Sequence, residues 1–452
     1  MDGHGLPEEF LRRMESQLGD EYPAFLECYD RPAYRGVRLN TLKCGEGTLR
    51  DSVPFELIPS PFSDTGFYAD YEGGFGKLPA HHAGMFYAQE PSASSAVTAL
   101  DPRPGERILD LCAAPGGKAT QIAGAMEGRG LLWANEPVRG RAGALLSNLE
   151  RLGVMNAVVS CAYPERLCPA LGGFFDRVLV DAPCSGEGMF RRDPGAIGEW
   201  SPEGVTACAR RQLAILDQAA GTVREGGVLV YSTCTFSYEE NEGTVKGFLS
   251  AHPEFTAEKI PHEFGRGDLD GGPARRVYPM DGGEGHFVAC FRRVGENICR
   301  AGEHRDMLKG ALLSRGRELL SELFAGDFSE APLIRAGDRL LLVPEDLPEL
   351  SGLPVLRAGA ELCEVRGGRK GSTERLEPSH GIFMCQRAEN CRQRLDLPID
   401  GPEILAYLRG EELDFGGSGY TAVCVNGVVT GFGKASGGRL KNRYPKGLRN
   451  LC

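Results

Sequence analysis

The sequence predicts a protein built around a doubly wound α/β sheet. From about residue 101 to 295, apolar strand-like segments alternate with helix-like segments, which is the pattern of parallel strands joined by crossover helices. Polar or glycine-rich turns follow several of these strands. Because 452 residues exceed the size of one ordinary core, we expect further domains on either side of this sheet.

The segments of the sheet can be placed in chain order. Strands are expected over 106–113, 130–136, 156–161, 176–183 and 226–235, and a late strand over 285–294 follows a Gly- and Asp-rich excursion, 265–285. Helices are expected over 118–126, 138–153 and 206–223. Apolar residues in the second helix recur at spacings of three and four, which is typical of a helix that packs one face against a sheet.

The flanking segments predict three more domains around the central one, 101–295. Residues 1–100 form a helical and irregular leader that ends in the apolar helical segment QEPSASSAVTAL. Residues 296–384 combine a charged helix with short strands. The last domain, 385–452, contains the hairpin-like segment YTAVCVNGVVTGFGK, with Asn426-Gly427 as its turn.

Composition and cysteine spacing exclude several classes of protein. No run of about 18 apolar residues predicts a membrane span, and the N-terminus lacks the apolar core of a signal peptide. The fifteen cysteines are spread over the chain without any C-x-x-C spacing. We therefore expect a cytoplasmic protein without a metal site, in which most cysteines are reduced core residues.

The net charge of −11 argues against a uniformly basic nucleic-acid binder but allows a local basic site. The last stretch, 430–452, has no acidic residue, and Phe432 and Tyr444 lie among its cations. This mixture favours a strand-and-loop surface that faces RNA; the alternative is a solvated basic tail. The cations are Lys434, Arg439, Lys441, Arg443, Lys446 and Arg449.

Residues that can take part in catalysis or ligand binding follow four of the predicted strands. Ligands of doubly wound sheets bind outside the carboxyl ends of the strands, so these loops are expected to meet at one edge. The loop after the first strand comprises Cys112, Ala113, Ala114, Pro115, Gly116, Gly117 and Lys118. The other three loops contribute Glu136, then Asp181 with Cys184, and finally Cys234.

The first of these loops fits a nucleoside without a pyrophosphate. A phosphate-binding Walker A motif needs Gly at position 112 and Ser or Thr at 119, where this chain has Cys112 and Ala119. The loop also differs from G-x-G-x-x-G, which disfavours a dinucleotide. Its Pro-Gly-Gly turn still permits close approach of a ligand to the backbone, and Glu136 is suited to accept hydrogen bonds from ribose hydroxyls.

Two cysteines at the ends of adjacent strands, Cys184 and Cys234, are candidate nucleophiles. A free thiol is only slightly ionised at neutral pH, so a nucleophilic one needs activating neighbours. Lys118 supplies positive charge, and Asp181 can accept or donate a proton or bind the amidine-like edge of a base. At this point the residues leave open which thiol attacks.

These segments resemble the Sun-type RNA cytosine-5 methyltransferases. LDLCAAPGGKATQIA resembles their S-adenosylmethionine loop, DAPCSGEGMFRRDP their Pro-Cys motif and YSTCTFSYEENE their Thr-Cys motif. The segments RGVRLNTLK, YAQEPSAS and RVYPMDGGEGHFVACFRR resemble further family motifs. The whole chain is similar to bacterial members that act on 16S ribosomal RNA, and GLPVLRAGAELCEVRGGR and GRLKNRYPKGLR resemble their C-terminal modules.

The resemblance implies a fold as well as a cofactor and partners. The central domain is expected to be a Rossmann-like class I methyltransferase domain with an antiparallel late strand. An α-rich N-terminal domain would precede it, and C-terminal α+β modules, the last one PUA-like and RNA-binding, would follow. The implied cofactor is S-adenosylmethionine and the implied partner is RNA; we expect a monomer and no membrane partner.

The resemblance also implies a role for each site residue. Carbon 5 of cytosine is a poor nucleophile until a thiolate adds to carbon 6; Cys234 would be that thiolate, and Cys184 would assist release of the product. Asp181 would hold the cytosine edge with support from Lys118. The cofactor would be held by Asp181, Glu136 and residues 112–118, while Gln89 and Ser92 would order the RNA-side wall. The target base must leave its stack to reach such a pocket.

One departure and three alternatives remain. Many family members have an acid after the third strand, near the adenine, where this chain has Ala162 and Tyr163; backbone groups or Tyr163 would then recognise the adenine. In a DNA cytosine-5 methyltransferase the Pro-Cys thiol would attack, which Cys234 and the basic C-terminus disfavour. A transfer-RNA substrate fits the same catalytic residues. An inactive RNA-binding assembly factor is disfavoured because all the proposed catalytic residues are present, namely Lys118, Asp181, Cys184 and Cys234.

Overall fold

The computed structural model describes residues 5–367 and 374–449, and it confirms the predicted doubly wound sheet. Five parallel strands pair in the order β9-β8-β5-β6-β7. The late strand β13 (His286–Arg293) pairs antiparallel with β9, as expected. The parallel strands are β5 (Arg107–Asp110), β6 (Leu131–Asn135), β7 (Ala157–Ser160), β8 (Phe175–Asp181) and β9 (Val223–Thr233).

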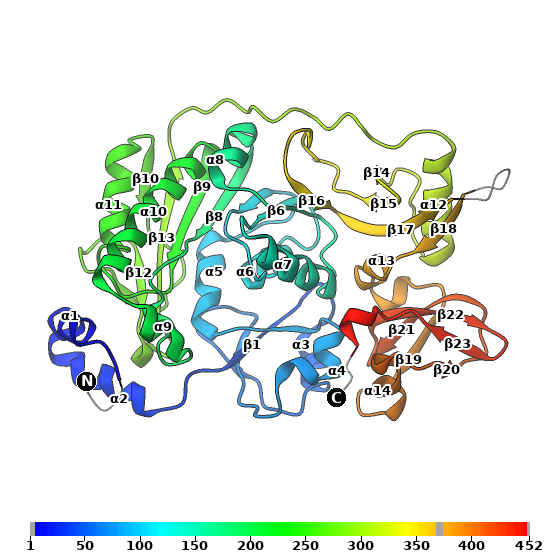
Figure 1. Ribbon diagram of the computed structural model, residues 1–452, viewed down its shortest axis with the longest axis horizontal. Helices are drawn as coiled ribbons and strands as arrows, with labels where there is room; N and C mark the ends of the chain where they lie inside the picture. Colours follow the sequence, from blue (N-terminus) through cyan, green and yellow to red (C-terminus); the bar gives the residue numbers. More distant parts are fainter. Residues whose placement is uncertain (1–4, 368–373, 450–452) are drawn as a thin grey trace.

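Helices cover both faces of this sheet (Figure 1). On one face, Leu216 of α10 (Pro202–Ala220) and Phe248 of α11 (Glu242–Ala251) pack in a core with Trp133 of β6. The opposite core contains side chains from α5 (Ser95–Leu100), α6 (Gly117–Ala125) and α7 (Arg139–Arg151). Each large apolar side chain buried in these layers contributes about 1.5–3 kcal/mol to stability.

The leader contains a sheet that the sequence did not indicate. The expectation of a helical and irregular segment is incomplete, because β2-β3-β1-β4 form a four-stranded antiparallel sheet. Strands of two to four residues are too short to show an alternating pattern. The elements are α1 (Glu8–Leu18), α2 (Tyr22–Glu27), β1 (Gly36–Leu39), α3 (Glu46–Arg50), β2 (Ile58–Pro59), β3 (Gly66–Tyr68), α4 (Pro79–His82) and β4 (Phe86–Ala88).

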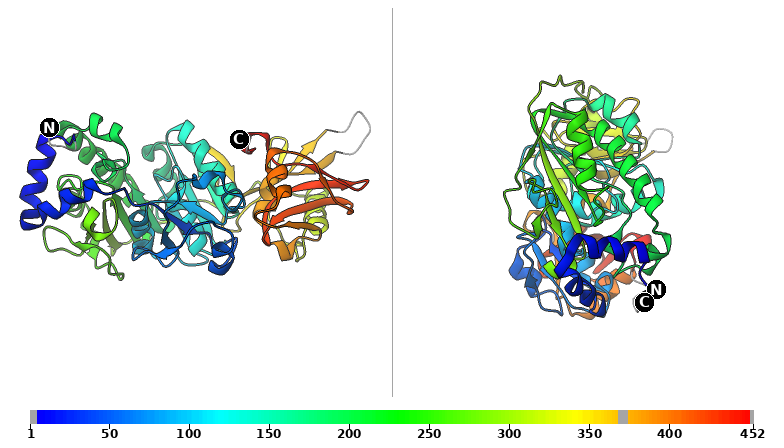
Figure 2. Two further views of the ribbon diagram at one scale, coloured as in Figure 1. Left: turned by 90° about the horizontal axis from the view of Figure 1, so that it is seen from below. Right: turned by 90° about the vertical axis from the view of Figure 1, so that its left-hand side faces the viewer.

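Two small sheets follow the central domain and lie at the opposite end of the molecule from α1 (Figures 1 and 2). The first has the order β14-β15-β17-β18 and the second β19-β21-β22-β23-β20. The Asn426-Gly427 turn is confirmed, since both residues have positive φ (46° and 75°), as a two-residue hairpin turn requires. These strands are β14 (Leu333–Ala336), β15 (Arg339–Leu342), β17 (Ala360–Arg366), β18 (Arg375–Pro378), β19 (Arg394–Leu397), β20 (Leu413–Asp414), β21 (Gly419–Val425), β22 (Val428–Ser436) and β23 (Arg439–Asn442).

The C-terminal modules are joined to the rest of the chain by specific contacts. Strand β16 (Val355–Ala358) extends the central sheet by pairing antiparallel with β7. The buried ammonium of Lys43 donates to the carbonyls of Met384 (2.7 Å) and Val429 (2.9 Å). The helices of these modules are α12 (Ala311–Leu323), α13 (His380–Met384) and α14 (Pro402–Arg409).

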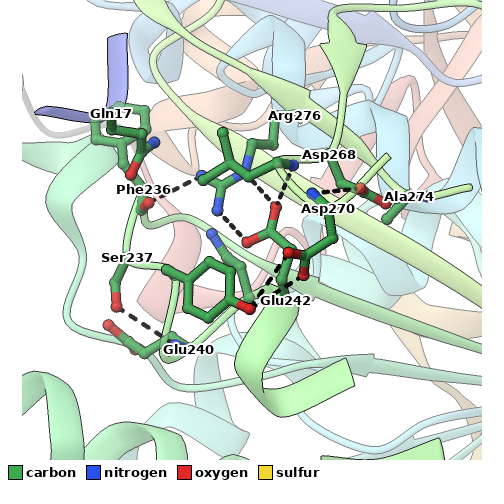
Figure 3. Close-up of polar contacts among 12 residues, drawn as sticks. Gln17, Phe236, Ser237, Glu240, Glu242, Asp268, Asp270, Ala274 and Arg276 are labelled. Carbon is green, nitrogen blue, oxygen red and sulfur yellow. Dashed lines mark hydrogen bonds and ion pairs between the residues drawn. The ribbon is translucent and has the colours of Figure 1, made fainter. Parts of the chain in front are cut away.

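The excursion before β13 is held in place by a buried ion pair (Figure 3). Arg276, in β12 (Arg275–Val277), donates to Glu242 at the start of α11 (Nε to Oε1, 2.7 Å) and to the carbonyl of Phe236 (2.9 Å). The carboxylate of Asp268 accepts from the backbone N–H groups of Gly272 and Ala274. Since β12 pairs with β13, this network fixes the point where β13 begins.

Within the described ranges, no helix is both long and apolar enough to cross a membrane.

Candidate active site

A cavity of about 280 Å³ lies where the loops after β5, β8 and β9 converge. Its wall includes Lys118, Asp181 and Cys234, which the sequence predicted to meet at one sheet edge. Parallel pairing of β8 and β9 places Asp181 opposite Ser232, so the two loops emerge side by side. The other walls come from 87–90 of the leader and from 284–286 at the start of β13.

The loop after β5 forms one wall of this cavity. Cys112, Ala113, Ala114, Pro115, Gly117 and Lys118 line it, whereas Gly116 lies behind the wall, where a side chain would approach Leu145 of α7 to 3.3 Å. Gly116 is the N-cap of α6 and has a φ of 114°. Residues with a side chain rarely adopt this left-handed backbone conformation.

Arg38 ties this loop to the leader, and sequence reasoning missed that role. Its guanidinium is buried and donates to the Gly117 carbonyl (3.1 Å), the Thr120 hydroxyl (2.7 Å) and Gln89 Oε1 (3.1 Å). Burial lowers the pKa of Arg38 to about 10. Strand β1 therefore positions both the loop and Gln89, which lines the cavity. The role of Gln89 on an RNA-side wall stays a prediction.

Glu136 lies beside the loop and does not line this cavity. Its buried carboxylate accepts from the backbone N–H of Val138 (2.9 Å) and is 3.4 Å from Arg141 Nη1. Arg141 also donates to the Ala114 carbonyl (2.9 Å). Glu136 is thus fixed beside the loop at the end of β6, and its role toward a cofactor remains a prediction.

Asp110 offers the loop's clearest fit to a cationic ligand group. Both of its carboxylate oxygens are buried without a hydrogen-bond partner among the described residues. Burial and the charge of Asp181 raise the pKa of Asp110 to about 8. At neutral pH Asp110 is therefore largely protonated, and a ligand that carries an ammonium and a sulfonium, as S-adenosylmethionine does, would favour its carboxylate form.

Lys118 and Asp181 form the charged centre of the site. Lys118 Nζ donates to Asp181 Oδ2 (2.9 Å), and the Ser232 hydroxyl donates to Oδ1 (2.7 Å). Burial opposes both charges, yet the ion pair outweighs burial: the pKa of Lys118 lies above its usual value, and Lys118, together with the hydrogen bond from Ser232, lowers the pKa of Asp181. Asp181 is therefore an oriented carboxylate at neutral pH.

Cys184 and Cys234 lie in direct contact. Their sulfurs are 3.1 Å apart, and the backbone N–H of Cys234 donates to Cys184 Sγ (3.4 Å). The hydrogen bond with Cys234 and burial raise the pKa of the Cys184 thiol well above its usual range. Cys184 therefore stays protonated and can donate its S–H to Cys234. Of these two cysteines, Cys234 lines the cavity and Cys184 lies behind it.

A buried carboxylate, which the sequence analysis did not single out, fixes the loop that carries Cys184. Glu240 accepts from the Ser185 backbone N–H (2.9 Å) and from Gln212 of α10 (2.8 Å), and it also accepts from the Ser185 hydroxyl. Burial raises the pKa of Glu240, whereas these donors lower it. The acidic segment EENE indicates a polar stretch, but its sequence does not show which of its acidic side chains is buried.

Other predicted residues lie away from the cavity. Ser92 is fully buried and donates to Glu90 (2.6 Å), so it shapes the wall through its neighbour. Tyr163 is 69% exposed at the end of β7. The described residues contain no group of three or more His, Cys, Asp or Glu that could hold a metal ion. The fourteen cysteines in the described part of the chain are free, and Cys452 lies outside it.

The basic C-terminal stretch is a surface, but its aromatic residues are not part of that surface. Phe432 and Tyr444 are buried, so the prediction that they face RNA is wrong: Tyr444 packs in a core that the last domain shares with the leader, and Phe432 packs in a core shared with the preceding small sheet. Residues Asn450, Leu451 and Cys452 of the stretch lie outside the described residues. Among the cations, Arg439, Lys441, Arg443 and Lys446 are exposed, and Lys434 is half-buried over the Tyr420 ring.

Comparison with known families places this arrangement. Residues 6–91 match the N-terminal domain of 16S rRNA methyltransferase RsmF and residues 97–292 the 16S rRNA methyltransferase RsmB/F model. Residues 317–385 match the first C-terminal domain of the RsmF rRNA methyltransferase and residues 394–450 the RsmF PUA domain. The chain belongs to the RsmF family. It is an S-adenosylmethionine-dependent methyltransferase with a PUA domain.

Individual RsmF proteins are similar over nearly the whole chain. Ribosomal RNA small subunit methyltransferase F of Klebsiella pneumoniae is 32% identical over 98% of this chain and 96% of its own. The Aliivibrio salmonicida protein of the same name is 31% identical over 98% and 97%. Among solved structures, NSun6 from Pyrococcus horikoshii is 26% identical with a TM-score of 0.57, covering 65% of this chain and 100% of its own.

Proposed function

We propose that this RsmF-type protein methylates carbon 5 of a cytosine in 16S ribosomal RNA through a covalent bond between Cys234 and carbon 6. The observation that carries the proposal is the thiol pair beside a charged carboxylate: Cys234 opens on the cavity, and Cys184 lies 3.1 Å behind it as a neutral thiol. A hydrogen bond from Cys184 stabilises negative charge on the Cys234 sulfur, which favours Cys234 as the nucleophile.

The residues of the chain account for each half of the reaction. The Cys234 thiolate bonds to carbon 6 and pushes electron density to carbon 5, while the Asp181 carboxylate accepts a hydrogen bond from the exocyclic amino group of the base. S-adenosylmethionine supplies the methyl group that carbon 5 takes up. Loss of the carbon-5 proton to a base then returns the electron pair of the C–S bond to Cys234, and the Cys184 S–H stabilises that departing thiolate.

The cofactor and the base fit opposite sides of the cavity. The wall formed by 112–118, with Asp110 beneath it and Glu136 alongside, is the proposed cofactor side. Cys234 and Asp181 form the base side. A cytosine must be extruded from its stack to reach Cys234, which costs a few kcal/mol. The exposed cations Lys441, Arg443 and Lys446 are the proposed phosphate contacts that offset part of this cost.

The named relatives support 16S ribosomal RNA as the substrate. Several of them carry the name ribosomal RNA small subunit methyltransferase F, and the match to them extends over all four segments of the chain. Transfer RNA is the competing substrate, because the catalytic residues fit a cytosine in either RNA. The choice between the two RNAs depends on the outer domains.

Bisulfite sequencing tests the proposal. Purified protein and S-adenosylmethionine are incubated with 16S ribosomal RNA, with small ribosomal subunits and with transfer RNA. We expect 5-methylcytosine in ribosomal RNA only, and none with Cys234→Ala, which should still bind the cofactor. Methylation of transfer RNA alone would overturn the substrate assignment, and full activity of Cys234→Ala would overturn the mechanism.

A further inference from the structure

His286 is a buried polar side chain on the cavity wall that the proposed mechanism leaves without a role. It is 5% exposed and begins β13. Neither ring nitrogen is hydrogen-bonded to another side chain among the described residues, and the backbone of Gly285 is the polar group beside the ring. His286 lines the cavity together with Asp181 and Cys234. Because nearly all buried polar groups are paired in native proteins, one that faces a binding cavity indicates a ligand group as its partner.

The strand order assigns His286 to the side of the cavity that would hold the base. In the sheet, β13 lies next to β9 and β9 next to β8, whereas the loop after β5 lies beyond β8. Phe287 pairs with Thr233, so His286 and Cys234 are the next residues along this antiparallel pair of strands. The proposed cofactor loop is thus two strands further away than Cys234.

The backbone holds His286 in place. His286 pairs with Val277 of β12, the strand anchored by the buried Arg276–Glu242 ion pair (Figure 3). Gly285, directly before it, has a φ of 148°, and a side chain there would come within 2.7 Å of the Phe236 ring. The backbone at His286 is therefore fixed at the cavity wall.

The surroundings of His286 keep the imidazole neutral. Burial and the positive charge of Lys118 lower the pKa of His286 to about 4, although Asp181, Glu90 and the backbone of Gly285 act in the opposite direction. A neutral imidazole has one nitrogen that accepts and one N–H that donates. At neutral pH the wall therefore presents a hydrogen-bond acceptor beside the Asp181 carboxylate.

We propose that His286 contacts the substrate, its unprotonated ring nitrogen accepting a hydrogen bond from the exocyclic amino group of the target cytosine. This inference rests on the proposed function and deepens it. The amino group has two N–H donors, whereas the Asp181 oxygens already accept from Lys118 and Ser232. A second acceptor satisfies the remaining N–H. Uracil has a carbonyl oxygen at that position, which would face two acceptors without a proton between them.

Removal of the amino group from the substrate tests this contact. RNA carrying 5-fluorocytosine at the target position traps the Cys234 adduct, because the fluorine cannot leave as the proton does. The same RNA with 5-fluoro-2-pyrimidinone lacks the amino group. For His286→Phe we expect adduct formation with 5-fluorocytosine RNA to slow by roughly ten- to a hundredfold, and adduct formation with the pyrimidinone RNA to stay within about twofold of wild type.

His286→Asn retains a side-chain acceptor and should recover part of the rate with 5-fluorocytosine RNA. His304→Phe is the matched control at a largely covered histidine outside the cavity, and both of its rates should equal those of wild type. Equal losses on the two RNAs in the Phe and Asn variants, or no loss in either, would overturn the contact. If wild-type protein forms an adduct with neither RNA, the proposed function itself fails.

Discussion

Replacement of Lys118 by Met tests the charge arrangement on which the site depends. Lys118 lowers the pKa of Asp181 against the effect of burial. Without the ammonium, burial dominates and the pKa of Asp181 rises. The carboxylate form is then lost at a higher pH than in the wild type, so the acid limb of the activity profile moves toward neutral pH.

The geometry gives the size of this shift. Lys118 Nζ and Asp181 Oδ2 are 2.9 Å apart, and 11% of the Lys118 side chain is exposed. An opposite charge at short range moves a carboxyl pKa by about 1–3 units. Because the hydrogen bond from Ser232 remains, we expect an upward shift of about 2 units, equivalent to about 3 kcal/mol.

The assay is the single-turnover rate of methyl transfer to ribosomal RNA, measured across the acid range with saturating cofactor. Lys246→Met is the matched control, since that lysine pairs with Asp270 on the surface, and its profile should equal that of wild type. An acid limb of Lys118→Met at the wild-type pH would refute the conclusion that Lys118 sets the protonation of Asp181.

Three further predictions concern the cofactor side, the RNA surface and stability. Glu136→Gln should weaken S-adenosylmethionine binding by about 1.5–3 kcal/mol in calorimetry, because a charged acceptor is lost; unchanged affinity would remove Glu136 from the cofactor site. Neutralising Lys441, Arg443 and Lys446 should reduce the log–log salt slope of RNA binding by roughly two, and an unchanged slope would mean that this surface does not contact RNA. Glu242→Gln leaves Arg276 buried without its counter-charge and should cost about 3–5 kcal/mol in urea unfolding; a cost below about 1 kcal/mol would show that the pair does not anchor the excursion.

The central domain could be predicted because its elements are long and periodic. The strand that ends at Asp181 and the helix over Arg139–Arg151 carry apolar patterns that survive without tertiary context. The convergence of Lys118, Asp181, Cys184 and Cys234 follows from sheet topology alone. These features depend on local sequence and on one general rule of parallel sheets.

Features that depend on non-local packing could not be predicted. The leader sheet consists of short strands that become stable only by pairing. Phe432 and Tyr444 look like RNA-facing aromatics in sequence, but they are enclosed in cores that the last domain shares with the leader and with the preceding small sheet. Glu240, Arg38 and His286 are polar residues within motifs, and only their burial shows that they support or face the cavity. A polar residue at the start of an apolar strand, as in GHFVAC, was the sole indication of His286.

The most direct test of the central claim is a denaturing gel of protein incubated with S-adenosylmethionine and target RNA. If Cys234 attacks and Cys184 assists release, Cys184→Ala accumulates a slow-migrating protein–RNA adduct, whereas Cys234→Ala forms none. An adduct with Cys234→Ala, or none with Cys184→Ala, would contradict this division of roles.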